Sequence, residues 1–307
     1  MSRSANANDT HNILEGLNAR LIRRDNALSV TDADIANEVL RDNQYRLSRE
    51  IGLNNAVFVD VGGHIGTFSA AVLALFDGAS VLVYEPDSEN FSFLIKNLAF
   101  EVERNRAHCF NVAVDAREGE LSLYVNTSNR GGSITRALEG DACAIPVKAH
   151  SIRDILESIA EGSDVVLKLD CEGAEYAILD SLFPMQIRSV CLVIMELHLT
   201  PALSRERRDP AAVLHRLTEA GFRVYVLEEI VYAGEGVFWI VAAVNQRFSH
   251  LGALGEHYAA CVPRIGGDRW YRRITNGRQP ALRGGVGWWR GKLWLAMGAG
   301  VLGWGEP

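Results

Sequence analysis

Several features that would mark a protein class are missing from this chain of 307 residues. Its five cysteines are an odd number without close pairs, which excludes a complete disulfide framework and a C-x-x-C zinc site and favours a reducing compartment. The first residues hold no apolar run of signal-peptide length, so we expect a cytoplasmic protein. Basic residues are too few for general nucleic-acid binding, since 31 Lys and Arg face 38 Asp and Glu.

The composition changes near residue 248. From there to residue 307 the chain holds eight Lys and Arg against three Asp and Glu, five of the six tryptophans and 13 of the 28 glycines. We therefore divide the chain into an N-terminal helical extension (1–50), a main domain (51–247) and a basic Trp/Gly-rich tail (248–307). Two interpretations of the tail stay open. It folds back on the main domain or is weakly ordered, or its Trp, Arg and Lys side chains make peripheral membrane contact.

Short apolar strands alternate with helical patterns through the main domain. We expect strands over residues 56–60, 80–85, 109–114, 165–170, 190–198, 222–229 and 237–244, with helices over 66–76, 88–100, 151–160, 175–183 and 210–221. Residues 121–125 and 145–149 predict an inserted antiparallel hairpin. The first 27 residues are polar and irregular, and a helix is expected over 31–51. The pattern predicts a doubly wound α/β domain with a mostly parallel seven-stranded sheet whose last strand is antiparallel.

Ligands of such sheets bind outside the carboxyl ends of the strands. The first strand ends in DVGGHIG, with Asp60, Gly62, His64 and Gly66, and its glycines permit close backbone approach. The order differs from the G-x-G-x-x-G of dinucleotide sites, and Asp60 would repel a pyrophosphate but attract a cationic group. The second strand ends in Glu85, which can accept hydrogen bonds from both hydroxyls of a ribose. A riboside with a cationic tail describes S-adenosylmethionine better than NAD.

The segments DVGGHIG, VYEPD, LKLDCEGAE and IMELH resemble, in that order, the FkbM family of S-adenosylmethionine-dependent methyltransferases over about residues 55–200. The most specific piece is KLDCEGAE (168–175), while Gly63 and His64 stand where the family usually has Ala and Asn. The resemblance implies a Rossmann-like methyltransferase domain that methylates hydroxyls of sugars, glycans or secondary metabolites.

Carried over position by position, the resemblance places the turn after the first strand at the methionine part of the cofactor and Glu85 at its ribose. Asn111 and Val112 would flank the adenine by backbone contacts, and Asp170 would lie near the methyl donor. The predicted cofactor-binding residues are therefore Asp60, Gly62, His64, Gly66, Glu85, Asn111, Val112 and Asp170.

An alcohol acceptor needs a base within reach, or a metal. Polar residues crowd the ends of the fourth and fifth strands: Lys168, Asp170, Glu172, Glu175, Glu196 and His198. We predict His198 or Asp170 as the base, with Glu196 positioning the substrate or His198, since a histidine pKa of about 6.5 suits a base near neutral pH. The alternative for His198 is a neutral ring bonded to backbone. Glu175 matches the acid that helix N-termini favour. The carboxylates can also suit Mg²⁺, but nothing in the sequence fixes their convergence, and we expect no metal site.

Two other functions compete with methyl transfer. A nicotinamide-dependent oxidoreductase fits the fold but lacks the dinucleotide fingerprint. A non-catalytic module that keeps the fold and binds S-adenosylmethionine or a partner is disfavoured by the intact set of cofactor residues. We expect the partner to be a small-molecule or glycan acceptor and not a nucleic acid. Arginines within residues 130–136 and 204–209 would suit an anionic acceptor.

Overall fold

The computed structural model describes residues 2–26, 29–126, 129–134, 143–232 and 236–262. Their main sheet has seven strands: β1 (Val57–Val61), β2 (Ser80–Tyr84), β3 (Ala107–Phe110), β8 (Val165–Leu169), β9 (Val190–Leu199), β10 (Phe222–Tyr232) and β11 (Gly236–Asn245). Their order in space is β10-β11-β9-β8-β1-β2-β3. Strands β9, β8, β1, β2 and β3 pair in parallel, and β11 is antiparallel to both of its neighbours. The predicted doubly wound α/β sheet with an antiparallel last strand is confirmed.

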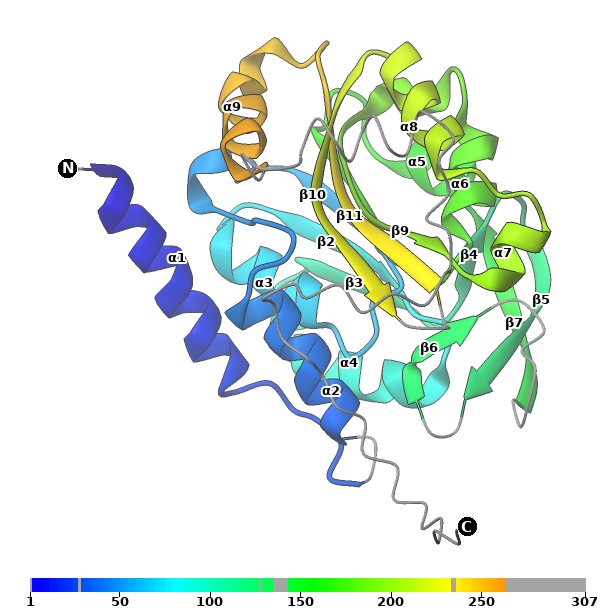
Figure 1. The fold of residues 1–307 in the computed structure, drawn as a ribbon. Helices are drawn as coiled ribbons and strands as arrows, with labels where there is room; N and C mark the ends of the chain where they lie inside the picture. The colour runs from blue at the N-terminus through cyan, green and yellow to red at the C-terminus, as the bar shows by residue number, and fades with distance from the viewer. Residues whose placement is uncertain (1, 27–28, 127–128, 135–142, 233–235, 263–307) are drawn as a thin grey trace, which may run out of the picture.

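Helices cover both faces of this sheet (Figure 1). Successive side chains of a strand point to opposite faces of the sheet, so Phe58 belongs to one buried cluster and its neighbour Val59 to the other. Each face therefore needs helices to cover it. On the Phe58 face lie α3 (Thr67–Leu75) and α4 (Ser88–Glu103). On the Val59 face lie α5 (Ile152–Ser158), α6 (Glu175–Leu182) and α8 (Pro210–Glu219). The short helices η3 (Gln186–Ser189) and α7 (Pro201–Arg205) flank β9. The near-continuous apolar strands are thus buried on both sides.

The N-terminal extension is more structured than the sequence indicates. Residues Ser2–Asn18 form α1, where an irregular segment was expected, and its buried Leu14 joins the core. The expected helix over 31–51 is wrong in its middle: α2 (Ser29–Ala36) and the π-helix η1 (Asn37–Arg41) are followed by non-helical chain up to η2 (Arg49–Ile51).

The interruption has a local cause in Asn43. Its side chain accepts a hydrogen bond from Leu47 N and donates one to Leu47 O, both at 2.8 Å. Such bonds offer the backbone an alternative to the helix ladder. Asn43 and Arg46 consequently adopt positive φ angles of 47° and 54°. The turn directs Gln44 and Tyr45, both buried, into the domain.

The segment after β3 changes sheets. The expected strand 109–114 is in fact two strands, since β3 ends at Phe110 and β4 (Ala113–Asp115) belongs to a second sheet, which leaves Asn111 and Val112 in the connection. That second sheet has the order β4-β7-β5-β6, with β5 (Gly119–Asn126), β6 (Asn129–Ile134) and β7 (Cys143–Ser151). The expected hairpin partners, β5 and β7, are antiparallel. They are joined by β4 and β6 into a larger sheet than predicted.

The start of the predicted tail packs on the main domain. After η4 (Ser249–Leu251), helix α9 (Gly252–Cys261) buries Leu254 and Tyr258, and Tyr225 Oη donates to Gly255 O at 3.0 Å. The predicted membrane contact concerns mainly residues 263–307, which lie outside the described residues. None of the helices in the described part of the chain combines the length and apolar character that a membrane span needs.

Candidate active site

The turns that follow β1 and β8 touch through Gly62. This glycine has a φ of +80°, and a Cβ atom on it would lie 1.8 Å from Asp170 O. Asp170 N in turn donates to Val61 O at 3.2 Å. Only glycine fits such an approach. The glycine turn after the first strand and the acidic segment after the fourth strand, which the sequence places over a hundred residues apart, are therefore in direct contact.

Asp60 and Lys168 form a buried ion pair beneath this contact. Lys168 Nζ lies 3.1 Å from Asp60 Oδ1 and donates to Gly62 O at 2.8 Å. Ser69 Oγ donates to Asp60 Oδ2 at 2.6 Å. Burial acts to lower the pKa of Lys168, but Asp60 and Asp170 outweigh it and raise that pKa. The charge of Asp60 is thus compensated inside the protein, so the sequence argument that this acid itself attracts a cationic ligand needs correction.

Glu85 lies at the end of β2, next to the glycine turn, as expected for a ribose ligand. Its carboxylate accepts hydrogen bonds from His64 N and Asp87 N, both at 2.8 Å. Burial raises the pKa of Glu85 to about 7. Asn111 holds the loop after β2, since its Nδ2 donates to Glu85 O at 2.8 Å. The partly buried Val112 packs against the core on the Val59 face. The structure therefore brings Asn111 next to Glu85, with its side chain bonded within the protein, while the cofactor roles of these residues stay predictions.

The N-terminal extension covers the Glu85 side of the turn. His64, with a φ of 50°, places its Nε2 3.5 Å from Asp32 Oδ1. Arg24 N donates to Asp32 Oδ2 at 2.9 Å, and the Arg24 side chain contacts both Asp32 and Asn90. Asn90 Nδ2 reaches Glu85 Oε1 at 3.3 Å. Burial lowers the pKa of His64 to about 3, so the ring is neutral at physiological pH.

Five side chains gather where β8 and β9 end, and we call them the acid–histidine cluster: Asp170, Glu172, Glu175, Glu196 and His198. Because β8 and β9 run in parallel with Leu169 opposite Met195, Asp170 and Glu196 follow at neighbouring positions. One ligand-type atom each of Asp170, Glu196 and His198 lies within 4.8 Å of the other two. The sequence predicted these three as the catalytic group, and the structure brings them together.

Both ring nitrogens of His198 face carboxylates. Nδ1 lies 3.2 Å from Glu175 Oε1, and Nε2 lies 3.6 Å from Glu172 Oε2 and 3.8 Å from Glu196 Oε2. The alternative of a neutral ring bonded to backbone is not what these contacts show. Glu175 also accepts a hydrogen bond from Cys171 N at 2.9 Å, as an acid at a helix start does. It therefore combines the predicted helix role with an unpredicted one at His198.

Two residues that contact the acid–histidine cluster were not predicted from the sequence. Gln44 Nε2 donates to Glu196 Oε1 at 2.8 Å. Tyr45 Oη donates to the same oxygen at 2.9 Å and lies 3.2 Å from Asp170 Oδ2. Both come from the extension that was expected to lie outside the domain. The only available signal was Asn43, whose turn-forming tendency predicts a break in the helix at that place.

Comparison with known proteins now gives the family. The model of the methyltransferase FkbM domain matches residues 60–224, more than half of the chain. This chain belongs to the FkbM methyltransferase family. The match contains all the predicted catalytic and cofactor residues. It excludes Gln44 and Tyr45, so the two hydrogen bonds that they donate to Glu196 come from residues outside the matched range.

Solved structures also resemble this FkbM-family chain. A precorrin-6y C5,15-methyltransferase from Geobacter metallireducens GS-15 is 13% identical with a TM-score of 0.37, over 67% of this chain and 88% of that one. An FkbM methyltransferase from Methylobacillus flagellatus KT is 15% identical with a TM-score of 0.37, over 74% of this chain and 58% of its own length. A putative RNA methyltransferase from Pyrococcus horikoshii is 14% identical with a TM-score of 0.41, over 78% and 98%. No match to this sequence was found among curated proteins.

Several side chains in the FkbM-family site have pKa values that differ from their ordinary values. Burial acts to lower the pKa of His198, but Glu172, Glu175 and Glu196 outweigh it and raise that pKa well above its ordinary value. Burial raises the pKa of Glu172 to about 7 and that of Glu196 to about 8. The carboxylates thus hold His198 in its charged form, which is not the form of a general base.

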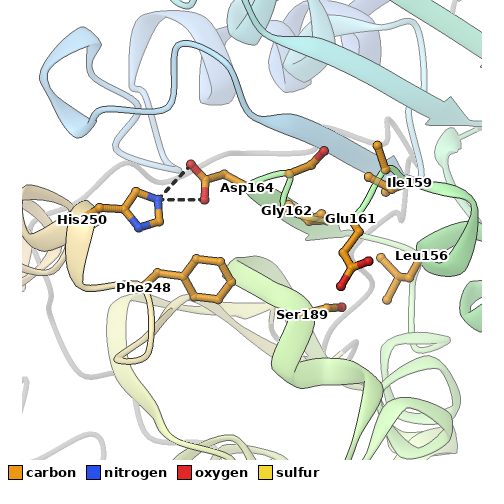
Figure 2. A pocket seen from close by; sticks show the side chains of 11 residues that line it. Leu156, Ile159, Glu161, Gly162, Asp164, Ser189, Phe248 and His250 are labelled. Carbon is orange, nitrogen blue, oxygen red and sulfur yellow. Dashed lines mark hydrogen bonds and ion pairs between the residues drawn. The ribbon is translucent and has the colours of Figure 1, made fainter.

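A cavity of about 330 Å³ lies at the other end of the strands. Figure 2 shows His250 and Asp164 at its rim, with the His250 ring 2.9 Å from the Asp164 carboxylate. Asp164 and Ser189, which also lines it, precede β8 and β9. The cavity therefore opens at the amino ends of these strands. Since ligands of doubly wound sheets bind at the carboxyl ends, it is not the candidate active site.

Replacing Gly66 by alanine is expected to lower the free energy of unfolding by about 1–2 kcal/mol, because the φ of +88° there strains any L side chain. The atoms nearest to an added Cβ lie at 3.4–3.5 Å, so strain and not a clash sets the cost. Gly119→Ala is the matched control, since nothing lies within 4 Å of its Cβ. Urea denaturation of both variants measures the difference. Equal stability of the two would contradict this account of the turn.

Proposed function

We propose that this FkbM-family protein transfers the methyl group of S-adenosylmethionine to a hydroxyl of a small molecule or glycan, such as a sugar or a secondary metabolite. The observation that carries the proposal is the contact of Gly62 with Asp170. It joins the turn expected to bind the methionine part of the cofactor to the acid–histidine cluster. A methyl donor bound at the turn would therefore have groups that accept a proton beside it.

The charges around the contact support a cationic donor. The acid–histidine cluster contains four carboxylates, and Lys168 and His198 are the cations that face them in the described residues. A sulfonium is favoured beside such a group because opposite charges attract more strongly away from bulk water. Glu85, at the end of the next strand, would accept hydrogen bonds from the ribose. Both features favour S-adenosylmethionine over a dinucleotide.

The chemical step is an in-line displacement. The acceptor oxygen forms a bond to the methyl carbon, the bond from that carbon to sulfur breaks, and the sulfonium becomes a neutral thioether. The hydroxyl proton passes to a carboxylate of the cluster. Asp170 and Glu172, whose side chains are 28% and 29% exposed, reach the acceptor side, whereas that of Glu196 is 11% exposed. Glu196 then positions its neighbours, in line with the role expected for it.

His198 serves this reaction as a positioning group in our proposal. Its ring is engaged by Glu175 on one side and faces Glu172 and Glu196 on the other, with an exposed side-chain fraction of 8%. A ring so enclosed has no path to an acceptor hydroxyl. The geometry therefore supports a carboxylate, one of the alternatives considered from the sequence, as the proton acceptor.

Calorimetric titration tests the cofactor, and transfer of a labelled methyl group tests the reaction. We expect S-adenosylmethionine to bind with micromolar affinity and NADH not to bind. Incubation with labelled cofactor and a panel of hydroxylated sugars and polyketides should then label at least one acceptor. Binding of NADH alone would overturn the proposal. Binding of S-adenosylmethionine without label in any hydroxyl compound would leave the family assignment and refute the proposed acceptor class.

Glu85→Gln is expected to weaken S-adenosylmethionine binding by about 10- to 100-fold, since hydrogen bonds to a charged group contribute about 1.5–3 kcal/mol. The new amide nitrogen would also face a backbone N–H of His64 or Asp87. Calorimetry measures the dissociation constant. Glu103→Gln, at the exposed end of α4, is the control and should bind normally. An unchanged dissociation constant in Glu85→Gln would remove Glu85 from the cofactor site.

A further inference from the structure

The spacing inside the acid–histidine cluster suits a shared cation. His198 Nε2 lies 3.6 Å from Glu172 Oε2 and 3.8 Å from Glu196 Oε2. Two atoms that bind one ion at about 2.1 Å, at angles between about 90° and 130°, lie about 3.0–3.8 Å apart. Asp170, Glu196 and His198 each offer one such atom within 4.8 Å of the others. The 3.8 Å between His198 and Glu196 is thus the separation of two ligands around one ion, and Asp170 offers a third atom within 4.8 Å of both.

Without an ion, the charged ring of His198 makes only long contacts through Nε2. A charged imidazole beside carboxylates normally forms short hydrogen bonds, at about 2.7–2.9 Å. In the part of the chain that the structure describes, Nε2 makes no hydrogen bond, although the side chain is 92% buried and this atom points at two carboxylates. Nε2 therefore faces the Glu172 and Glu196 carboxylates at separations longer than a hydrogen bond, and a cation bound between them would contact both sides.

The remaining atoms of His198 and Glu196 are already held by neighbouring residues. Nδ1 of His198 faces Glu175 Oε1 at 3.2 Å and keeps its proton there, so an ion that binds Nε2 would displace the second proton of the charged ring. Glu196 uses Oε1 to accept from Tyr45 and Gln44, and its Oε2 faces His198. Histidines that bind metals are held in this way, by a carboxylate on the second nitrogen, and their carboxylate co-ligands are likewise hydrogen-bonded.

We propose that Asp170, Glu196 and His198 form a binding site for a divalent first-row transition metal, with Glu175, Tyr45 and Gln44 orienting the ligands. Two carboxylates balance the charge of such an ion. An imidazole nitrogen favours Mn²⁺, Fe²⁺ or Zn²⁺ over Mg²⁺, which prefers oxygen ligands alone. We expected no metal site from the sequence because it does not show whether these side chains lie close together. In the structure they do.

The catalytic use of this site rests on the proposed function. A bound cation would hold the acceptor oxygen and lower the pKa of its hydroxyl, which makes an alcohol a better nucleophile. Asp170 would then serve as a ligand, and the hydroxyl proton would go to Glu172, which reaches the same side. The site thus defines the acceptor further, as an oxygen compound able to bind a metal.

Binding of Mn²⁺ to the full-length protein tests the site without any methyl transfer. The protein is treated with EDTA, desalted and titrated with Mn²⁺, and free Mn²⁺ is followed by electron paramagnetic resonance. We expect one ion per chain, and at least 10-fold weaker binding in His198→Ala and in Glu196→Gln. His215→Ala, which removes an exposed histidine on α8, should bind as the wild type does. Unchanged affinity in His198→Ala would overturn the proposal.

A measurement on the wild-type protein tests the site even if the variants do not fold. Electron spin-echo modulation of the bound Mn²⁺ should show coupling to an imidazole ¹⁴N nucleus, and its absence would refute His198 as a ligand. The outcomes also separate the two proposals. Bound Mn²⁺ without methylated hydroxyls would keep the metal site and refute the proposed function. Methyl transfer that survives EDTA, together with no Mn²⁺ binding, would keep the function and refute the metal site.

Discussion

Replacing Lys168 by methionine is expected to lower the free energy of unfolding by about 3–5 kcal/mol, the usual cost of removing one partner from a buried ion pair. Lys168 is almost fully buried, and its Nζ contacts Asp60 at 3.1 Å, Asp170 at 3.6 Å and Gly62 O at 2.8 Å. Methionine fills a similar volume but leaves the fully buried Asp60 charge without its cation. Urea denaturation followed by circular dichroism measures the loss.

The double variant Lys168→Met/Asp60→Asn provides the sharpest check on this account. If the uncompensated carboxylate causes the loss, removing its charge as well should recover a large part of the stability. Lys96→Met, on the exposed side of α4, is the control and should change stability by no more than about 0.5 kcal/mol. A loss below about 1 kcal/mol in Lys168→Met would show that the buried pair does not hold the two strand ends together.

The main sheet could be predicted because its strands carry a strong signal. Buried parallel strands are continuous apolar runs, and the short link after β10 permits only an antiparallel return. The split between β3 and β4 carried no such signal, since CFNVAV (109–114) is one continuous run. What separates the two strands is Asn111, whose amide binds Glu85 O and turns the chain toward the second sheet. That contact is tertiary and cannot be seen in a local pattern.

The sequence indicates which strand-end residues lie together, but not which residues pair with them. Asp170, Glu196 and His198 follow from the rule that parallel strands end at one edge of the sheet. The pairing of Asp60 with Lys168 reversed the electrostatic argument, because the sequence shows a carboxylate but not which cation lies against it. Tyr45 is 151 residues away from Glu196, whose oxygen it holds. Such a contact depends on how the N-terminal extension folds over the domain.

Asp170→Asn is expected to lower the turnover number by about 10²- to 10⁴-fold, the range that a positioned acid–base group contributes. The amide keeps the size of the side chain, and its nitrogen can donate to Tyr45 Oη, which lies 3.2 Å from the Asp170 carboxylate. Turnover is measured with labelled S-adenosylmethionine and the acceptor that the wild type methylates. Asp180→Asn, on the exposed face of α6, is the matched control and should keep normal turnover. Normal turnover in Asp170→Asn would remove this residue from the reaction.

Comparison with Glu172→Gln decides how Asp170 acts. A residue that only accepts the proton affects turnover alone, whereas a metal ligand also affects Mn²⁺ affinity. If Asp170 is a ligand and Glu172 the proton acceptor, Asp170→Asn should weaken Mn²⁺ binding and turnover together, and Glu172→Gln should lower turnover with Mn²⁺ affinity retained. The reverse pattern would place the ion on Glu172, which lies 3.6 Å from His198 Nε2, and would make Asp170 the base.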